Sequence, residues 1–444
     1  MFETVRNAWR IPDLRRKLIF TLFALAIYRF GANIPVPGIN TDALVYYFST
    51  QLENTIFGMQ NMLSGGALSQ GTVFALSIQP YINASIIMQL LTVGIPALER
   101  MQKDGGEEGK KKIAAITRYV TVALGLLLGF AYYTMLKNQL NIIADDSLWT
   151  AIVIILSFTA GSAFIMWLGE QITEFGIGNG ISVILFASIV SRGVSIVTRM
   201  YNLVFPAPVT DEATGELVAS PSLWWVVVIA LVGAVLLVAF VVFITNAERR
   251  LPVQYAKRVV GRRMYGGQNT HLPLKVNMSG VMPIIFAQSI ASFPATIAMF
   301  FNSRQDSFFN TWLSSGSVLY SVLYFLLIIG FSYFYTSIQF NPVEIANNLK
   351  QNGGSIPGFR QGKPTSDFIR KVLGKITLFG AIFLGIIAIL PTITGAIMTA
   401  AGVQSGASLS LGGTSILIVV GVALETVKAI EAQMVMRNYK GFLE

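Results

Sequence analysis

Apolar stretches alternate with short polar segments along the whole 444-residue chain. Each stretch holds roughly 16 to 26 residues, and a helix of about 20 residues crosses a hydrocarbon core of about 30 Å. The pattern therefore predicts an all-α polytopic membrane protein with ten membrane-spanning helices. Their approximate ranges are 18–33, 73–98, 113–136, 148–168, 180–198, 223–245, 280–301, 317–337, 372–391 and 412–430.

The entrance to the second predicted span interrupts this pattern, because residues 65–72 are small, partly polar and rich in glycine. Irregular backbone survives at membrane depth only inside the protein or beside water. The sequence therefore predicts a short element tucked into a cavity, followed by a helix that lines the cavity. An ordinary external loop is the alternative. The element comprises Leu63, Ser64, Gly65, Gly66, Ala67, Leu68, Ser69, Gln70, Gly71, Thr72 and Val73.

The composition also indicates a membrane protein, since 53% of the residues are hydrophobic and only 12% are charged. Cysteine is absent, which excludes disulfides, thiolate nucleophiles and cysteine-ligated metals. The one histidine, His271, lies in a basic loop, where a solvated or partner-facing side chain is expected rather than a metal ligand. We therefore expect no metal and no cofactor.

The distribution of basic residues predicts the orientation in the membrane. With the N-terminus in the cytoplasm, 27 of the 32 Lys and Arg residues fall in cytoplasmic segments, four fall outside, and Arg29 lies in the first span. Both termini are therefore expected in the cytoplasm. This orientation fits a bacterial inner (plasma) membrane, and a thylakoid membrane is the alternative. Residues 1–17 hold Phe2, Val5 and Trp9 at helical spacing among basic residues, which is typical of an amphipathic helix at the membrane interface.

An even count of ten spans divides as five plus five, so the second half must enter the membrane from the opposite side. Inverted halves of this kind place a functional path at their interface, near the midplane. The predicted units are an amphipathic cytoplasmic segment 1–17, a first half 18–198, an external connecting loop 199–222, a second half 223–430 with cytoplasmic loops 246–279 and 338–371, and a cytoplasmic tail 431–444.

Intramembrane chemistry is sparse. Ion-coupled transporters usually bury carboxylates or histidines at mid-membrane, whereas few charged residues fall inside the predicted spans, and Arg29 in the first span lies four residues from its outer end. The position of Arg29 is explained equally well by a side chain that extends to the membrane interface and by a functional site. The sequence contains no HExxH, no Gly-x-Ser-x-Gly and no Asp or Glu pair within a span. These observations argue against an enzyme, and a secondary transporter of small solutes remains the main alternative function.

Bulky apolar residues recur where they can surround a path. Ile82 and Ile86 share one face of the second span at a spacing of four residues. Similar residues in three later spans are Leu185, Ile189, Ile285 and Ile418, with Met282 beside them. A narrow ring of such side chains can seal against ions. The alternative for each residue is ordinary packing or contact with lipid.

Several motifs resemble the SecY family of bacterial protein-translocation channels. Besides the stretch 65–98, they are IYRFGANIPVPGI (27–39), GIGNGIS (176–182), LPLKVNMSGVMPIIFA (272–287), FPATIA (293–298), FNPVEIANNLKQNGGSIPGFRQGKPT (340–365) and GGTSILIVV (412–420). They follow the family order from the first span to the last, so the resemblance covers essentially the whole chain.

The resemblance implies a ten-span channel of two pseudo-symmetric halves that moves unfolded polypeptides across the membrane. It also implies lateral release of hydrophobic segments between spans 2–3 and 7–8. Residues 63–73 would be the plug, and the six apolar residues at 82, 86, 185, 189, 285 and 418 the pore ring.

The same resemblance implies partners. SecE and SecG are the expected small membrane subunits, the SecA motor ATPase or the ribosome the expected cytosolic partners, and secretory and membrane-protein precursors the substrates. The motor or ribosome would contact the two large cytoplasmic loops. The residues expected to make this contact are Arg249, Arg250, Lys257, Arg258, Arg262, Arg263 and Arg360.

Overall fold

A computed structural model of the chain describes residues 2–50, 56–138, 140–143, 145, 147–206, 209–210, 217–218, 224–255, 258–260, 263–265, 269–298, 317–400 and 413–440. Most of these residues are helical. Within them, six helices are long and apolar enough to cross a membrane, or seven if one sharply bent pair counts as a span. The chain is therefore a mostly helical polytopic membrane protein, as its sequence predicts.

Each of the ten predicted spans overlaps a helix. Up to residue 204 the helices are α1 (Phe2–Arg10), α2 (Pro12–Gly31), α3 (Thr41–Thr50), α4 (Ile56–Leu63), α5 (Gln79–Gly94), α6 (Pro96–Lys103), α7 (Gly106–Asn138), α8 (Leu148–Phe175), α9 (Gly180–Ser191) and α10 (Gly193–Val204). The later helices are α11 (Trp224–Asn246), α12 (Met282–Ala298), α14 (Val318–Gln339), α15 (Pro342–Gln351), α16 (Lys363–Ala400) and α17 (Gly413–Lys440).

The prediction of a continuous second span over 73–98 is wrong at both ends. Residues 73–78 form turns, and Ser77 adopts a left-handed φ of 49°, so α5 begins only at Gln79. At the other end, Pro96 lacks the N–H that would continue α5. A new helix, α6, leaves there at a bend of 104°. The fifth predicted span is also interrupted, at Arg192 between α9 and α10.

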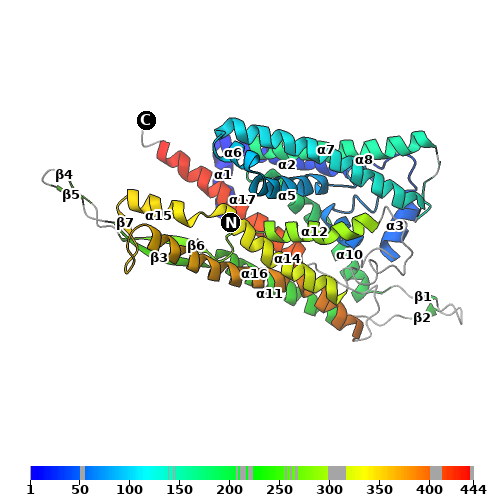
Figure 1. Ribbon diagram of the computed structural model, residues 1–444. Coiled ribbons are helices and arrows are strands. Elements are labelled where there is room, and N and C mark those ends of the chain that lie inside the picture. The colour runs from blue at the N-terminus through cyan, green and yellow to red at the C-terminus, as the bar shows by residue number, and fades with distance from the viewer. Residues whose placement is uncertain are drawn as a thin grey trace.

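Contacts between helices divide the elements into two sets. The first set, α2, α5, α7, α8 and α9, comes from the first half of the chain, and the second, α11, α12, α14, α16 and α17, from the second half. The sets meet where α9 packs on α17 and where α5 packs on α12. Figure 1 shows α2, α7 and α8 along one side of the molecule and α11, α14 and α16 along the opposite side.

The loop predicted over 246–279 contains a β-hairpin, so the all-α description is incomplete. β3 (Glu248–Tyr255) pairs antiparallel with β6 (Asn269–Lys275), and Leu251 lies opposite Leu272. β3 also pairs with β7 (Gly354–Ser355), which belongs to the second predicted loop. Two short antiparallel pairs complete the strands: β1 (Val209–Thr210) with β2 (Leu217–Val218), and β4 (Arg258–Val260) with β5 (Arg263–Tyr265).

The β3–β6–β7 sheet has its own small apolar core. Exposed and buried residues alternate from Arg250 to Gln254 along β3, as in a strand with one buried face. Leu251 and Val253 on that face pack with Leu274, Ile356 and Ile369. The two predicted loops therefore form one folded unit, the terminal sheet domain, which lies with α15 at the opposite end of the molecule from α3 (Figure 1).

Candidate functional site

A cavity of about 610 Å³ lies at one end of the two helix sets, the end where α3 is found. Three arginines, Arg29, Arg192 and Arg199, contribute to its wall, and its lining residues include no carboxylate. Residues of segment 63–73 and of α4 line one side, and apolar residues of α17, including Val419, line another. The cavity thus lies between the two helix sets and has a mainly apolar wall that also contains three arginines.

Segment 63–73 closes one side of this cavity. It follows α4 as a series of turns, and Gly65, Gly66 and Gly71 adopt left-handed φ values of 68°, 91° and 58°. Ala67 and Leu68 are almost fully buried. The expectation that this irregular stretch lies inside the protein is confirmed by the burial of its apolar side chains.

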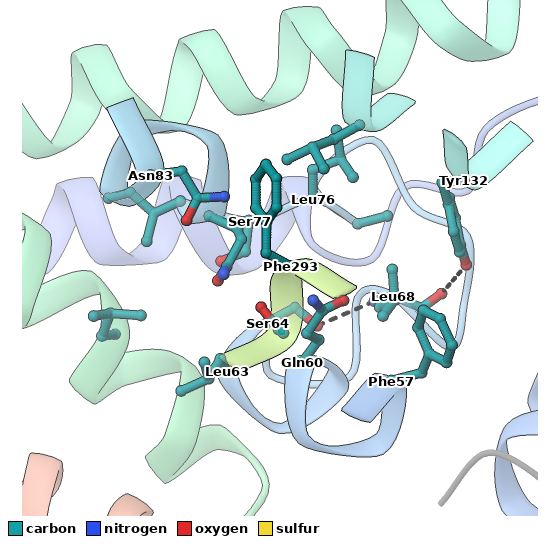
Figure 2. Close-up of a pocket in the computed structure, with 16 residues that line it drawn as sticks. Phe57, Gln60, Leu63, Ser64, Leu68, Leu76, Ser77, Asn83, Tyr132 and Phe293 are labelled. Atoms are coloured by element: carbon teal, nitrogen blue, oxygen red, sulfur yellow. Dashed lines mark hydrogen bonds between the residues drawn. The ribbon is translucent and has the colours of Figure 1, made fainter. Parts of the chain in front are cut away.

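Side chains of neighbouring helices hold the carbonyl groups of this segment. The Tyr132 hydroxyl on α7 donates to Leu68 O at 2.7 Å, as Figure 2 shows. On α2, the Tyr28 hydroxyl lies 3.4 Å from Ser64 O, and Arg29 donates from Nη1 to Gly65 O at 3.2 Å. Sequence analysis did not identify these roles, although a tyrosine within an apolar span indicates a hydroxyl that needs a partner.

The six residues predicted as a ring meet in one apolar cluster. Ile82, Ile86, Leu185, Ile285 and Ile418 are all at least nine-tenths buried members of it, and the half-buried Ile189 packs against it. They come from α5, α9, α12 and α17, and therefore from both helix sets. Ile189 also lines the large cavity. The apolar cluster therefore borders the large cavity at Ile189.

A second cavity, of about 50 Å³, lies between segment 63–73, the start of α5 and α12. Its wall includes Ser64 and Leu68 of the segment, Asn83 of α5, Leu185 of α9 and Phe293 of α12. Figure 2 shows Phe293 beside the turns of the segment. The small cavity therefore marks the place where the segment, the apolar cluster and the second helix set come together.

The basic residues predicted to bind cytosolic partners gather at the terminal sheet domain. Arg249 and Arg250 are exposed on β3, and Arg360 is exposed in the loop between β7 and α16. Because β7 pairs with β3, the structure brings the loops of Arg250 and Arg360 into one unit. Arg258 and Arg263 fall on the backbone of β4 and β5. Lys257 and Arg262 lie outside the described residues.

Comparison with known proteins places this geometry in a family. The profile of the SecY family matches residues 72–427. A protein translocase subunit SecY from Streptomyces scabiei is 43% identical over 459 aligned residues, which cover 100% of both chains. The chain belongs to the SecY family. The SecY match starts at Thr72, so the first part of segment 63–73 falls outside it.

Solved structures agree with the SecY fold. A SecY whose plug domain stabilises the closed state of the translocation channel and maintains a membrane seal superposes with a TM-score of 0.62 at 17% identity, covering 95% of this chain and 92% of that one. Sec61 in the canine ribosome–channel complex from the endoplasmic reticulum superposes with a TM-score of 0.61 at 16% identity, covering 95% and 93%.

Membership of the SecY family settles the function class. The chain is a protein-conducting channel of the Sec translocon and a multi-pass membrane protein, and it catalyses no reaction. The alternative of a small-solute transporter is set aside by the full-length match to SecY.

Proposed function

We propose that unfolded polypeptides pass between the two helix sets, through the large cavity and the apolar cluster. The observation that carries this proposal is the cluster itself, to which α5, α9, α12 and α17 all contribute. Bulky apolar side chains from opposite sides can part around a polypeptide and close again without leaving charged groups exposed. Ile82, Ile86, Leu185, Ile189, Ile285 and Ile418 form the ring of this seal.

Ten membrane spans in two inverted halves of five, 18–198 and 223–430, fit this path. The two helix sets correspond to these halves, and the ten predicted spans each overlap a helix. With this arrangement the terminal sheet domain and both termini lie in the cytoplasm, and α3 and the large cavity lie outside, in a bacterial plasma membrane. The basic residues of the sheet domain support this orientation.

Segment 63–73 is the plug of the closed channel. Three observations support this role: its apolar residues are buried, it bounds both cavities, and it borders the apolar cluster. A relative of the same fold uses its plug domain to maintain a membrane seal. Displacement of the plug would join the large cavity to the path.

Hydrophobic segments leave the path sideways between α5 and α12. These helices touch although they belong to different sets, and the small cavity lies beside their contact. A seam between two sets is the natural place for lateral opening, because no covalent loop has to cross it there.

The terminal sheet domain is the docking surface for SecA or the ribosome. Exposed Arg249, Arg250 and Arg360 present positive charge on one folded unit. Positive side chains suit acidic protein surfaces and the phosphates of ribosomal RNA. A similar fold occurs in a ribosome–channel complex. SecE and SecG are the proposed membrane subunits.

Reconstitution tests the proposed function as a whole. Proteoliposomes containing this chain with SecE and SecG would receive SecA, ATP and a secretory precursor, and protease-protected precursor would be measured. We expect transport that requires both SecA and ATP. Uptake of small solutes without precursor transport would contradict the proposal.

A further inference from the structure

The plug is a compact unit with its own hydrogen bonds. Asn61 Oδ1 accepts from Ser69 N at 3.0 Å, and Ser64 Oγ accepts from Leu68 N at 3.2 Å. Ser69 Oγ in turn donates to Gly66 O at 2.9 Å. The Ser64–Leu68 and Ser69–Gly66 bonds stay intact if residues 64–70 move together. The bond to Asn61 on α4 would break, as would the bonds from Thr72 N and Oγ1 to Ala67 O at 3.2 and 3.3 Å.

Apart from the bonds to α4 and to Thr72, the polar contacts of residues 64–70 come from side chains of the first helix set. Tyr28 and Arg29 of α2 reach the carbonyls of Ser64 and Gly65, and Tyr132 of α7 reaches the carbonyl of Leu68. Tyr28 is itself held by Ser188 of α9, 2.7 Å from oxygen to oxygen. Two of these anchoring side chains, Tyr28 and Tyr132, are nearly fully buried.

The C-terminal end of the plug is attached differently, through backbone. Gly71 O accepts from Val36 N at 3.0 Å, and Val73 N donates to Ile34 O at 2.9 Å. Thr72 lies between them in a bridge with Pro35. Gly71 has a left-handed φ of 58°, a conformation that glycine adopts without strain. Residues Thr72 and Val73, which are held by backbone contacts, thus follow directly after Gly71, whose backbone has the conformational freedom of glycine.

We propose that Tyr28, Arg29 and Tyr132 are positioning residues that latch residues 64–70 in the closed channel, and that the plug pivots at Gly71 while Thr72 and Val73 stay in place. This inference rests on the proposed role of segment 63–73 as the plug. It adds which bonds must break for opening, and which part of the segment moves.

The geometry of the hydrogen bonds ranks Tyr28, Arg29 and Tyr132 by how strongly each holds the plug. Tyr132 makes the shortest bond, at 2.7 Å, in fully buried surroundings, where loss of a partner leaves a carbonyl unpaired away from water. The Arg29 bond is longer and only partly buried, so water can replace it. The Tyr28 contact with Ser64 is 3.4 Å and close to the limit for a hydrogen bond. Removal of the Tyr132 hydroxyl should therefore free the plug most.

The rate at which a buried thiol reacts with a water-soluble maleimide measures how often the plug leaves its seat. The chain has no cysteine, so an introduced one reports alone. Ala67→Cys places the thiol at a buried position of the moving part, and Thr72→Cys places it at a buried position of the fixed end. Both reporters would be read in the reconstituted resting channel, in the absence of precursor.

In the Tyr132→Phe background, alkylation at Ala67→Cys should rise by roughly tenfold, equivalent to about 1.4 kcal/mol. Alkylation at Thr72→Cys should not change. Tyr28→Phe should raise the rate at position 67 less than Tyr132→Phe does. Tyr133→Phe is the matched control, because it removes the hydroxyl of another buried tyrosine on the same helix and leaves the bond to Leu68 in place. Equal rates in Tyr132→Phe and Tyr133→Phe would overturn the latch, and so would an equal rise at positions 67 and 72, which indicates general loosening.

A disulfide separates failure of the latch from failure of the plug. A Cβ added to Gly65 would lie 2.9 Å from Ser191 Oγ. In a disulfide with an S–S bond of about 2.04 Å, the Cβ of one cysteine lies about 3 Å from the sulfur of the other. The distance at Gly65 is close to this value. Oxidised Gly65→Cys/Ser191→Cys should therefore hold the plug, block precursor translocation, and recover on reduction. Full translocation by the oxidised protein would overturn the plug role itself. A block by the disulfide, combined with unchanged labelling in Tyr132→Phe, would overturn only the latch.

Discussion

Gln79 of α5 and Ser289 of α12, which are 210 residues apart in sequence, meet across the two helix sets with 3.5 Å between Gln79 Nε2 and Ser289 Oγ. Donor–acceptor separations in protein hydrogen bonds are usually about 2.9–3.0 Å, so this contact is weak. It lies beside the small cavity, which Gln79 also lines. The seam between the sets is therefore held at this point by a contact that costs little to break.

Linking the two sides of this seam should prevent opening. Cysteines at Gln79 and Ser289, joined by a short cleavable bifunctional thiol reagent, should block precursor translocation and insertion of a hydrophobic segment. Cleavage of the reagent should restore both. A long flexible reagent at the same two positions is the control and should be tolerated, because it permits separation. If the short link forms and both activities persist, the path does not open between α5 and α12.

Polar residues in the apolar cluster should open the resting seal to ions. Ile82→Asn with Ile86→Asn places two amides among bulky side chains of both helix sets, which favours hydration of the path. We expect a several-fold rise in resting conductance across planar bilayers. Ile87→Asn with Leu91→Asn makes the same chemical change on less buried positions of α5 and should leave the conductance low. Equal conductance of the two double variants would assign Ile82 and Ile86 to ordinary packing.

The sequence predicted where helices occur along the chain, and each of the ten predicted spans overlaps a helix, because long apolar stretches carry a strong signal. It predicted the burial of segment 63–73 from its polarity at membrane depth. The start of α5 was missed because the left-handed turn at Ser77 leaves no mark in composition. The β3–β6 hairpin was hidden by its basic residues, although Arg250, Leu251, Pro252 and Val253 alternate in burial with a period of two.

The candidate site was predictable in part. Apolar residues such as Ile82 and Ile418 were found by their spacing and by resemblance, and the structure gathers them in one cluster. The side chains that contact segment 63–73 were not found, because Tyr28 and Tyr132 are far from it in sequence and the bonds go to main-chain carbonyls. A carbonyl acceptor is present at every residue, so no pattern of side chains reveals it.

Arg360 should act in partner docking rather than in folding. Its side chain is exposed, whereas its carbonyl is held by Thr365 Oγ1 at 2.7 Å, so Arg360→Glu reverses a surface charge and leaves that bond intact. We expect the affinity for SecA to fall by about tenfold or more, equivalent to about 1.4 kcal/mol. Binding to the reconstituted complex would be measured by titration at fixed ionic strength. Lys350→Glu, an equal reversal on exposed α15, is the control and should have a smaller effect. Unchanged binding in Arg360→Glu, or loss of the complex in detergent, would refute the docking role.

Gly161 of α8 should be intolerant of even one methyl group. A Cβ at this position would collide with Val73 O, at the end of segment 63–73. The carbonyl cannot move easily, because Val73 N is bonded to Ile34 O. Gly161→Ala should therefore destabilise the protein by about 1–3 kcal/mol, the usual cost of overpacking. Thermal unfolding in detergent, followed by fluorescence-detected size exclusion, would measure this loss. Gly233→Ala on α11 adds the same methyl group where no atom lies within 4 Å, and should unfold at the wild-type temperature. If both variants are equally stable, α8 does not pack against the plug as tightly as the structure shows.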